Sequence, residues 1–412
     1  MVKYSSPHTR QIASLVPFVC SLVFACFCFC YLYLFQADYL AQFQFHFSHG
    51  ETTYQPLIGA SLITLLLVLL GLFVHRIIRW PLRFAALAWF PSAFLLTAIT
   101  SVRLPELPDY STGTPWVAMA VALVVFVLCT ILCCMHPDAT GERSALSSYL
   151  SSNLLVLSLL LFMTGVLGYS SDVGHRELRM GRFVHEGKYA DVAYCCHDTA
   201  DITYRLYSLR AAGLALDGAL GDRLFEFPVP AGVSTLMPAQ SDSEFVYNAL
   251  PALYQGMQAV PRSSEKFSEQ HFLAQVVALD SIARPLALDY LLCSHLLCGE
   301  LHGFAQVLVQ HTDSLSTSLP KHYREALVLI RNLWGMGSQR TSSPKPTSTS
   351  TVGKAVKSVE HTLFLYSDSL MQRSFDRFCR LYDASLEGNQ AAIDSLADYS
   401  HTYWAYYASR FQ

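Results

Sequence analysis

The segment RFVHEGKYADVAYCC, residues 182–196, marks the point where the sequence changes character. Residues 1–170 before it are strongly apolar, whereas residues 171–412 have the composition of an ordinary soluble domain. Its centre, Gly187-Lys188-Tyr189, has the form of a turn between two packed helices, because glycine accepts the positive φ that follows a helix end. The segment therefore separates two parts of the chain that are expected to fold differently, and each part is read from its own pattern of residues.

The overall composition indicates a membrane protein with a soluble part. Hydrophobic residues make up 52% of the chain and charged residues only 14%. A typical soluble domain carries roughly 25% charged residues. The formal net charge is −3, so no basic surface indicates a nucleic-acid partner.

The N-terminal part contains five apolar stretches, each long enough to cross a bilayer. A membrane helix needs about 20 mostly apolar residues, and none of the five contains Asp, Glu, Lys or Arg. Backbone polar groups in lipid must bond within the segment, so each stretch is predicted to be helical. Pro91 interrupts the third stretch. Residues 1–170 are thus predicted to form a transmembrane domain with spans at about 12–35, 57–75, 84–102, 116–135 and 149–168.

The positive charges in the connecting loops predict the orientation of these spans. The loops on the opposite side of the membrane hold only Arg103. On the N-terminal side lie Lys3, Arg10, Arg76, Arg79, Arg83 and Arg143. The N-terminus is therefore predicted to be cytoplasmic. Five spans then place residues 171–412 outside the cytoplasm, in the periplasm if the protein lies in a bacterial inner membrane.

Residues 171–412 are predicted to form an all-α domain of paired helices. Stretches predicted to be helical, at about 172–186, 200–217, 284–298 and 371–387, are each followed by a glycine, at 187, 218, 299 and 388; the stretch 284–298 is apolar throughout most of its length. Helix–glycine–helix units are typical of tetratricopeptide-like arrays, in which stacked pairs share a core and leave a concave face. The spacing of the units is uneven, so irregular repeats and a non-repeating helical domain are both compatible with the pattern.

A further helix is predicted from Pro320 to about Trp334, with one apolar stripe that includes Tyr323 and Leu327. Residues 337–354 are dominated by Ser, Thr and Pro and have no large apolar side chain. Such a segment cannot bury enough apolar surface to offset the entropy of ordering. It is therefore predicted to be a flexible linker.

The closing segment DYSHTYWAYYASRF, residues 398–411, carries aromatic side chains at helical spacing. Three arrangements are compatible with it: docking on the preceding helices, contact with the membrane surface, or contact with a partner. Docking is favoured because a terminal repeat must cover the exposed core of the stack. Phe375 and Phe378, one helix upstream, are expected to receive it.

Four motifs carry a family resemblance: GKYADV at 187–192, ALDYLLCSHLLCGELHGFAQVL at 287–308, LPKHYREALVLI at 319–330 and HTYWAYYASRF at 401–411. Their order after a multi-spanning segment resembles a family of uncharacterised bacterial integral membrane proteins, classed as a domain of unknown function, with a tetratricopeptide-like C-terminal part. The resemblance covers mainly residues 175–412 and is strongest at 319–330 and 399–411. Members of that family usually have more spans than this chain. The resemblance implies no catalytic residue or cofactor, because the family has no established activity.

The sequence contains none of the common catalytic signatures: no GxGxxG, phosphate loop, HExxH or GxSxG occurs in it. His295 and His302 are seven residues apart and were candidates for one helix face, but no carboxylate supports them in the sequence. We therefore predict no catalytic, cofactor-binding or metal-binding residue.

These features favour a binding or scaffolding protein over an enzyme. The expected partners are the lipid bilayer and a peptide or protein held by the helical domain. The alternative is a membrane enzyme resembling glycosyltransferases that build envelope polymers, and a small transporter is a third option. Such an enzyme needs acidic residues in its outer loops, where the sequence offers Asp38, Glu51, Glu106 and Asp109.

Overall fold

The computed structural model describes residues 7–78, 80–101, 115–135, 146–195, 202–239, 248–261, 268–279, 285–312, 318–340 and 366–411. Within these ranges the chain is helical and contains no strand, which confirms the all-α prediction. It forms two compact units, Met1–Arg179 and Met180–Gln412, with the boundary inside helix α7 (Asp172–His185).

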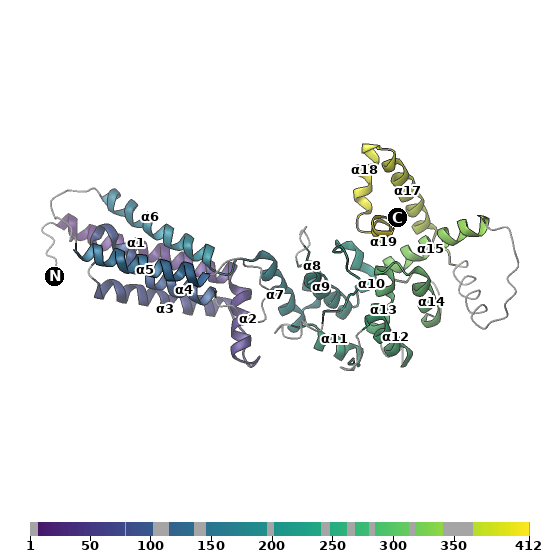
Figure 1. The fold of residues 1–412 in the computed structure, drawn as a ribbon, viewed down its shortest axis with the longest axis horizontal. Helices are drawn as coiled ribbons and strands as arrows, with labels where there is room; N and C mark the ends of the chain where they lie inside the picture. Colours follow the sequence, from purple (N-terminus) through teal and green to yellow (C-terminus); the bar gives the residue numbers. More distant parts are fainter. Residues whose placement is uncertain are drawn as a thin grey trace. The chain divides into compact units, whose positions relative to one another are not determined.

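The first unit is built mainly from long apolar helices (Figure 1). Four segments are long and apolar enough to cross a membrane: Ser14–Phe35, Pro56–Ile77, Leu82–Thr100 and Leu146–Leu167. They correspond to the first, second, third and fifth predicted spans. The predicted span 116–135 forms a helix of its own, but its described apolar part, Val117–Ile131, is shorter. The helices are α1 (Pro7–Cys30), η1 (Tyr31–Phe35), α2 (Ala37–Phe47), α3 (Pro56–Ile77), η2 (Leu82–Trp89), α4 (Phe90–Thr100), α5 (Pro115–Met135) and α6 (Leu146–Leu167).

The third apolar segment changes helix type at Pro91. A 3-10 helix, η2, occupies its first part, and α4 begins one residue before Pro91. Within η2 the backbone is non-helical at Phe84, and the side chain of Asn153 from α6 bonds the groups on either side: it accepts a hydrogen bond from the Ala86 amide (2.7 Å) and donates one to the Leu82 carbonyl (2.8 Å). In an apolar surrounding such freed backbone groups need a protein partner. Asn153 is fully buried, so it acts as that partner.

The second unit consists of shorter helices joined by tight turns (Figure 1). Residues 227–239 have no regular structure. After α7 the elements are α8 (Tyr189–Tyr194), α9 (Tyr204–Leu216), α10 (Leu220–Arg223), η3 (Leu224–Glu226), α11 (Leu250–Met257), α12 (Glu269–Leu279), α13 (Pro285–Leu297), α14 (Leu301–His311), α15 (Lys321–Arg340), α17 (Ser369–Leu386), α18 (Gln390–Leu396), η5 (Ala397–Tyr399) and α19 (Tyr403–Phe411).

The four glycines predicted to form helix–helix turns share one geometry. Gly187, Gly218, Gly299 and Gly388 have φ values of 71°, 74°, 70° and 83°. At each turn the glycine amide donates to the carbonyl three residues back, and the next amide donates to the carbonyl five residues before it. This is the Schellman arrangement, which satisfies the last carbonyls of a helix. The following helix starts within two residues in every case, so these turns join helices as predicted.

Some helix boundaries differ from the prediction. Helix α15 continues to Arg340 rather than ending near Trp334, so residues 337–340 are helical. Residues 341–354 of the predicted linker lie outside the described residues. Helix α9 begins at Tyr204. Thr203 caps its N-terminus, because the Leu206 amide donates a hydrogen bond to the Thr203 hydroxyl at 3.2 Å.

The closing segment docks on the preceding helices, as predicted. The Trp404 ring centroid lies 5.2 Å from that of Phe375 and 6.0 Å from that of Phe378, both on α17. Tyr403 and Trp404 are almost fully buried. The aromatic residues do not form a single helix, however, because Tyr399 lies in η5 and the chain turns before α19 begins.

Candidate functional site

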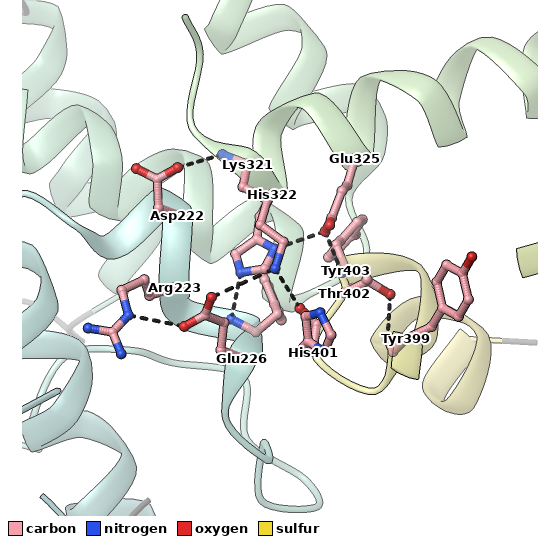
Figure 2. A network of polar contacts seen from close by, with 11 residues as sticks. Asp222, Arg223, Glu226, Lys321, His322, Glu325, Tyr399, His401, Thr402 and Tyr403 are labelled. Carbon is pink, nitrogen blue, oxygen red and sulfur yellow. Dashed lines mark hydrogen bonds and ion pairs between the residues drawn. The ribbon is translucent and has the colours of Figure 1, made fainter. Parts of the chain in front are cut away.

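A buried polar network connects the start of α15 with the closing segment of the chain (Figure 2). Its members come from the two motifs in which the sequence resemblance is strongest, 319–330 and 399–411, and from the short elements α10 and η3. Helix α15 packs against both α10 and α19. These contacts bring together residues that are about 80 positions apart, which makes the network the leading candidate for a functional centre.

His322 and Glu325 form the buried centre of the network. The two residues are 0% and 1% exposed, and His322 Nδ1 lies 2.9 Å from Glu325 Oε2. The amide of Phe225 donates to His322 Nε2 at 3.2 Å. Because Nε2 accepts a hydrogen bond, the ring proton is assigned to Nδ1, which donates it to the carboxylate. His322 is therefore held in one tautomer by its two partners.

Glu325 also holds the closing helix. The Tyr403 amide donates to Glu325 Oε2 at 2.7 Å, which provides an acceptor for an amide at the start of α19. The indole Nε1 of Trp404 donates to the Glu325 backbone carbonyl at 2.8 Å. One residue of α15 thus binds two consecutive residues of α19.

Partly exposed charged residues surround this centre (Figure 2). The Lys321 amide donates to Asp222 Oδ1 at 2.7 Å, and its ammonium Nζ donates to the His401 carbonyl at 3.2 Å. Lys321 Nζ also lies 3.7 Å from Glu226 Oε1, and Arg223 Nε donates to Glu226 Oε2 at 3.0 Å. Asp222 and Glu226 thereby connect α10 and η3 to the first residue of α15.

The geometry of this network favours a structural role. A general base needs a nitrogen or oxygen within reach of a substrate proton, but both ring nitrogens of His322 already have protein partners. The carboxylate oxygen of Glu325 that faces His322 accepts two hydrogen bonds. The network fastens three segments of the unit together rather than presenting a reactive group.

A second buried group lies beside the network, between α13 and α15. The Tyr323 hydroxyl donates to Asp289 Oδ1 at 3.1 Å and lies 3.5 Å from Cys293 Sγ. Burial raises the pKa of Asp289 to about 6. Burial likewise raises the pKa of the Cys293 thiol, so this cysteine stays protonated at neutral pH and is a poor nucleophile.

The four acids considered for an outer-loop enzyme do not form a described cluster. Asp38 is buried, and its Oδ2 accepts hydrogen bonds of 2.9 Å from both Nε and Nη2 of Arg179. Glu51 is exposed. Glu106 and Asp109 lie outside the described residues. Asp38 is therefore bound in an ion pair with Arg179.

The histidines considered for a metal site are separated by a turn. His295 lies at the end of α13 and His302 lies in α14, beyond Gly299. His295 Nδ1 lies 2.8 Å from Glu300 Oε2, a carboxylate contact that spacing in the sequence did not suggest. In the ranges that the structure describes, no group of three His, Cys, Asp or Glu side chains is arranged to hold a metal ion.

Sequence reasoning missed the residues at the centre of this network. The motif LPKHYREALVLI was recognised for its apolar stripe and its family resemblance, and His322 and Glu325 were not singled out. A usable signal was present, because a histidine and a glutamate three residues apart on a helix can pair directly. Their partners Phe225 and Tyr403 carry no such signal, since both contribute backbone amides.

Comparison with known proteins supports the family resemblance over part of the chain and assigns no activity. No curated protein and no solved structure matches the chain. Both motifs that build the network, LPKHYREALVLI and HTYWAYYASRF, fall almost wholly inside the one region for which a family match is found. The expected resemblance to an uncharacterised family is confirmed there: residues 247–410 match a family of unknown function, DUF6057.

Proposed function

We propose that this protein is a membrane-anchored scaffold whose helical second unit binds a peptide or a protein. In this proposal five helices, α5 among them, span a bacterial inner membrane with the N-terminus in the cytoplasm. The second unit then lies in the periplasm. The asymmetry of Lys and Arg between the loops supports this orientation.

The main support comes from the way the second unit is closed. Its terminal helix α19 is fastened by the Glu325 carboxylate and by aromatic contacts, so the last helix covers the core that precedes it. A capped stack of paired helices is the usual way in which helical-repeat proteins build a rigid binding surface. The four glycine turns with the same geometry support a tetratricopeptide-like origin for this unit.

The chemistry of the described residues also supports binding over catalysis. The buried His322–Glu325 pair has its hydrogen-bonding positions occupied by protein groups, and burial keeps Cys293 protonated. Neither group is available as a general base or a nucleophile in this arrangement.

Site-specific photo-crosslinking in cells tests the proposal. A photoreactive amino acid is introduced into the full-length protein at Leu279, Leu370 or Leu386, whose side chains are 75%, 72% and 72% exposed. The matched control is Leu327, which is buried. A scaffold should give a discrete adduct from at least one exposed position and none from Leu327. Membrane-localised protein that forms no adduct at any exposed position would contradict the proposal.

Substitution of the three outer-loop acids other than Asp38 separates the enzyme alternative from the scaffold, because only the enzyme needs them for its reaction. A triple variant, Glu51→Gln with Glu106→Gln and Asp109→Asn, is introduced into the photo-crosslinking protein. A scaffold should keep its adduct and should complement any phenotype of a deletion strain. An intact adduct together with failed complementation would favour the glycosyltransferase-like enzyme instead.

A further inference from the structure

A short irregular segment, Val233–Met237, buries the side chains of Val233, Leu236 and Met237 and is held by side chains from several helices; we call it the strap. The Arg410 guanidinium of α19 donates to the Val233 carbonyl. Glu269, the first residue of α12, accepts hydrogen bonds from the amides of Leu236 (2.8 Å) and Met237 (2.9 Å) through Oε2. Polar contacts from α12 and α19 therefore hold the strap backbone, and Glu269 binds two of its amides.

The second carboxylate oxygen of Glu269 lacks a protein partner. Glu269 is 3% exposed, and its Oε1 makes no hydrogen bond to the described part of the chain. The Ser294 hydroxyl of α13 lies close enough to the carboxylate to lower its pKa against the larger effect of burial. The geometry of a direct hydrogen bond is nevertheless not met, and Ser294 Oγ also has no partner among the described residues.

Two buried tyrosine hydroxyls lie near the same carboxylate. Tyr290 is on the same helix as Ser294, four residues earlier, and Tyr207 is on α9, which packs against α13. Both rings are almost fully buried, and neither hydroxyl has a hydrogen-bond partner within the described ranges. Burial raises the pKa of both phenols, and the Glu269 charge raises it further. Because α13 packs against both α9 and α12, these side chains share one interior region of the unit.

Four buried polar groups without partners in one region call for a bound species. An unmade hydrogen bond in a protein interior is costly, and native proteins leave few such groups. The species must donate to Glu269 Oε1 and accept from hydroxyl groups. Water does both, and buried water typically makes about three hydrogen bonds to groups of this kind. A cation would bind the lone pairs of the hydroxyl oxygens and leave their protons without an acceptor, and two backbone amides already neutralise part of the Glu269 charge.

We propose that the second unit contains a buried water site between Glu269 Oε1, the Ser294 hydroxyl and the hydroxyls of Tyr207 and Tyr290. The bound water links α9, α12 and α13 beneath the strap, where the protein groups do not reach one another directly. It holds the carboxylate whose other oxygen anchors Leu236 and Met237. This inference rests on the interior of the unit and is independent of the proposed scaffold function.

Hydrogen–deuterium exchange of the full-length protein in lipid nanodiscs tests the site. Tyr207→Phe and Tyr290→Phe remove one hydroxyl each and keep the ring. If a water joins the two hydroxyls, each variant should speed exchange in peptides covering 233–239 by about fivefold, the effect of one net hydrogen bond. The double variant should exchange much more slowly than the product of the two single effects predicts, because the first substitution already releases the water.

The opposite outcomes would overturn the proposal. Without a bound water, both hydroxyls are unsatisfied, and replacing them by phenylalanine should slow exchange or leave it unchanged. A control pairs Tyr207→Phe with Tyr323→Phe, whose lost hydroxyl has a direct partner in Asp289, and the two effects should multiply. Ser294→Ala provides a second small change and should also speed exchange. Protection that rises when ammonium or potassium replaces sodium would assign the position to a cation instead of water.

Discussion

Glu325 joins three elements of the second unit through one carboxylate oxygen. Its Oε2 accepts from His322 within α15 and from the Tyr403 amide of α19, and His322 in turn accepts from the Phe225 amide of η3. A buried acceptor of this kind contributes more to the free energy of unfolding than an exposed one. When it is removed, no water can replace it as the partner of the buried donors.

Glu325→Ala should therefore destabilise the second unit by about 2–4 kcal/mol, since it leaves the His322 ring proton and the Tyr403 amide buried without an acceptor. Glu325→Gln keeps a carbonyl oxygen and should cost clearly less. Denaturant unfolding of the full chain in detergent measures the effect. The control is Glu387→Ala, at an exposed position, which should be near neutral. Equal stability of the Glu325 and Glu387 variants would show that the buried carboxylate does not hold α19.

Glu269 makes the stability of the unit depend on pH. Burial raises its pKa to about 7, above that of a glutamate in the unfolded chain, near 4.3. A raised folded-state pKa means that the folded protein binds the proton more tightly than the unfolded protein. The contribution of this group to stability is therefore complete below about pH 4 and is lost as pH rises through about 7.

We expect the ionisation of Glu269 to lower the melting temperature of the protein as the pH is raised from 5 to 8. Glu269→Gln cannot ionise and keeps an acceptor for Leu236 and Met237, so it should remove that part of the pH dependence. Thermal unfolding of both proteins across this range provides the comparison. If the two proteins show parallel curves, Glu269 does not titrate in this window.

Helix α19 is the element that closes the second unit. Its Trp404 packs on Phe375 and Phe378, and the hydroxyls of Tyr403 and Tyr406 donate to the last carbonyls of α13, those of Leu296 and Leu297. These two hydrogen bonds tie α19 to the C-terminal end of α13, in addition to the turn at Gly299, whose amide also donates to the Leu296 carbonyl. The helix therefore contributes apolar burial and polar contacts together.

Truncation after Glu387 removes α18, η5 and α19 and should unfold or aggregate residues 171–412 produced alone, without lipid. Each fully buried aromatic side chain contributes about 1.5–3 kcal/mol, and the loss also exposes Phe375 and Phe378. Circular dichroism and light scattering measure the outcome. The intact 171–412 fragment is the control and should be helical and monodisperse. A truncated fragment with an unchanged melting temperature would leave contact with lipid or with a partner as the role of the tail.

The whole molecule combines a first unit of long apolar helices with a second unit of mostly shorter helices. Four helices of the first unit are long and apolar enough to cross a membrane, which is compatible with a membrane protein. The side of the membrane on which the second unit lies depends on the number of spans, and α5 decides between an even and an odd number.

A reporter-fusion experiment checks this proposed topology. Alkaline phosphatase, which is active only outside the cytoplasm, should be active when fused after residue 412 and inactive when fused near residue 80. The physical reason is the excess of Lys and Arg in the loops on the N-terminal side. Comparable protein levels on immunoblots control for expression. An inactive fusion at 412 would place the second unit in the cytoplasm and reduce the number of spans to an even one.

Local patterns in the sequence determined much of this architecture. The apolar stretches, the helical periodicity and the turn glycines depend on residues a few positions apart, so they could be recognised without a structure. The four glycines at 187, 218, 299 and 388 illustrate this, because positive φ after a helix is a property of the turn itself. The docking of the tail was also predicted, from the need to cover the last exposed helix.

Only the tertiary structure decided which distant groups meet. His322 and Glu325 bind the backbone amides of Phe225 and Tyr403. Almost every residue has a backbone amide, so the sequence does not indicate which amides these side chains will bind. The irregular backbone around Phe84 is tolerated because Asn153, in another helix, bonds the Ala86 amide and the Leu82 carbonyl on either side of it. Such partners are brought together by packing over long separations in the chain, where neither periodicity nor propensity carries information.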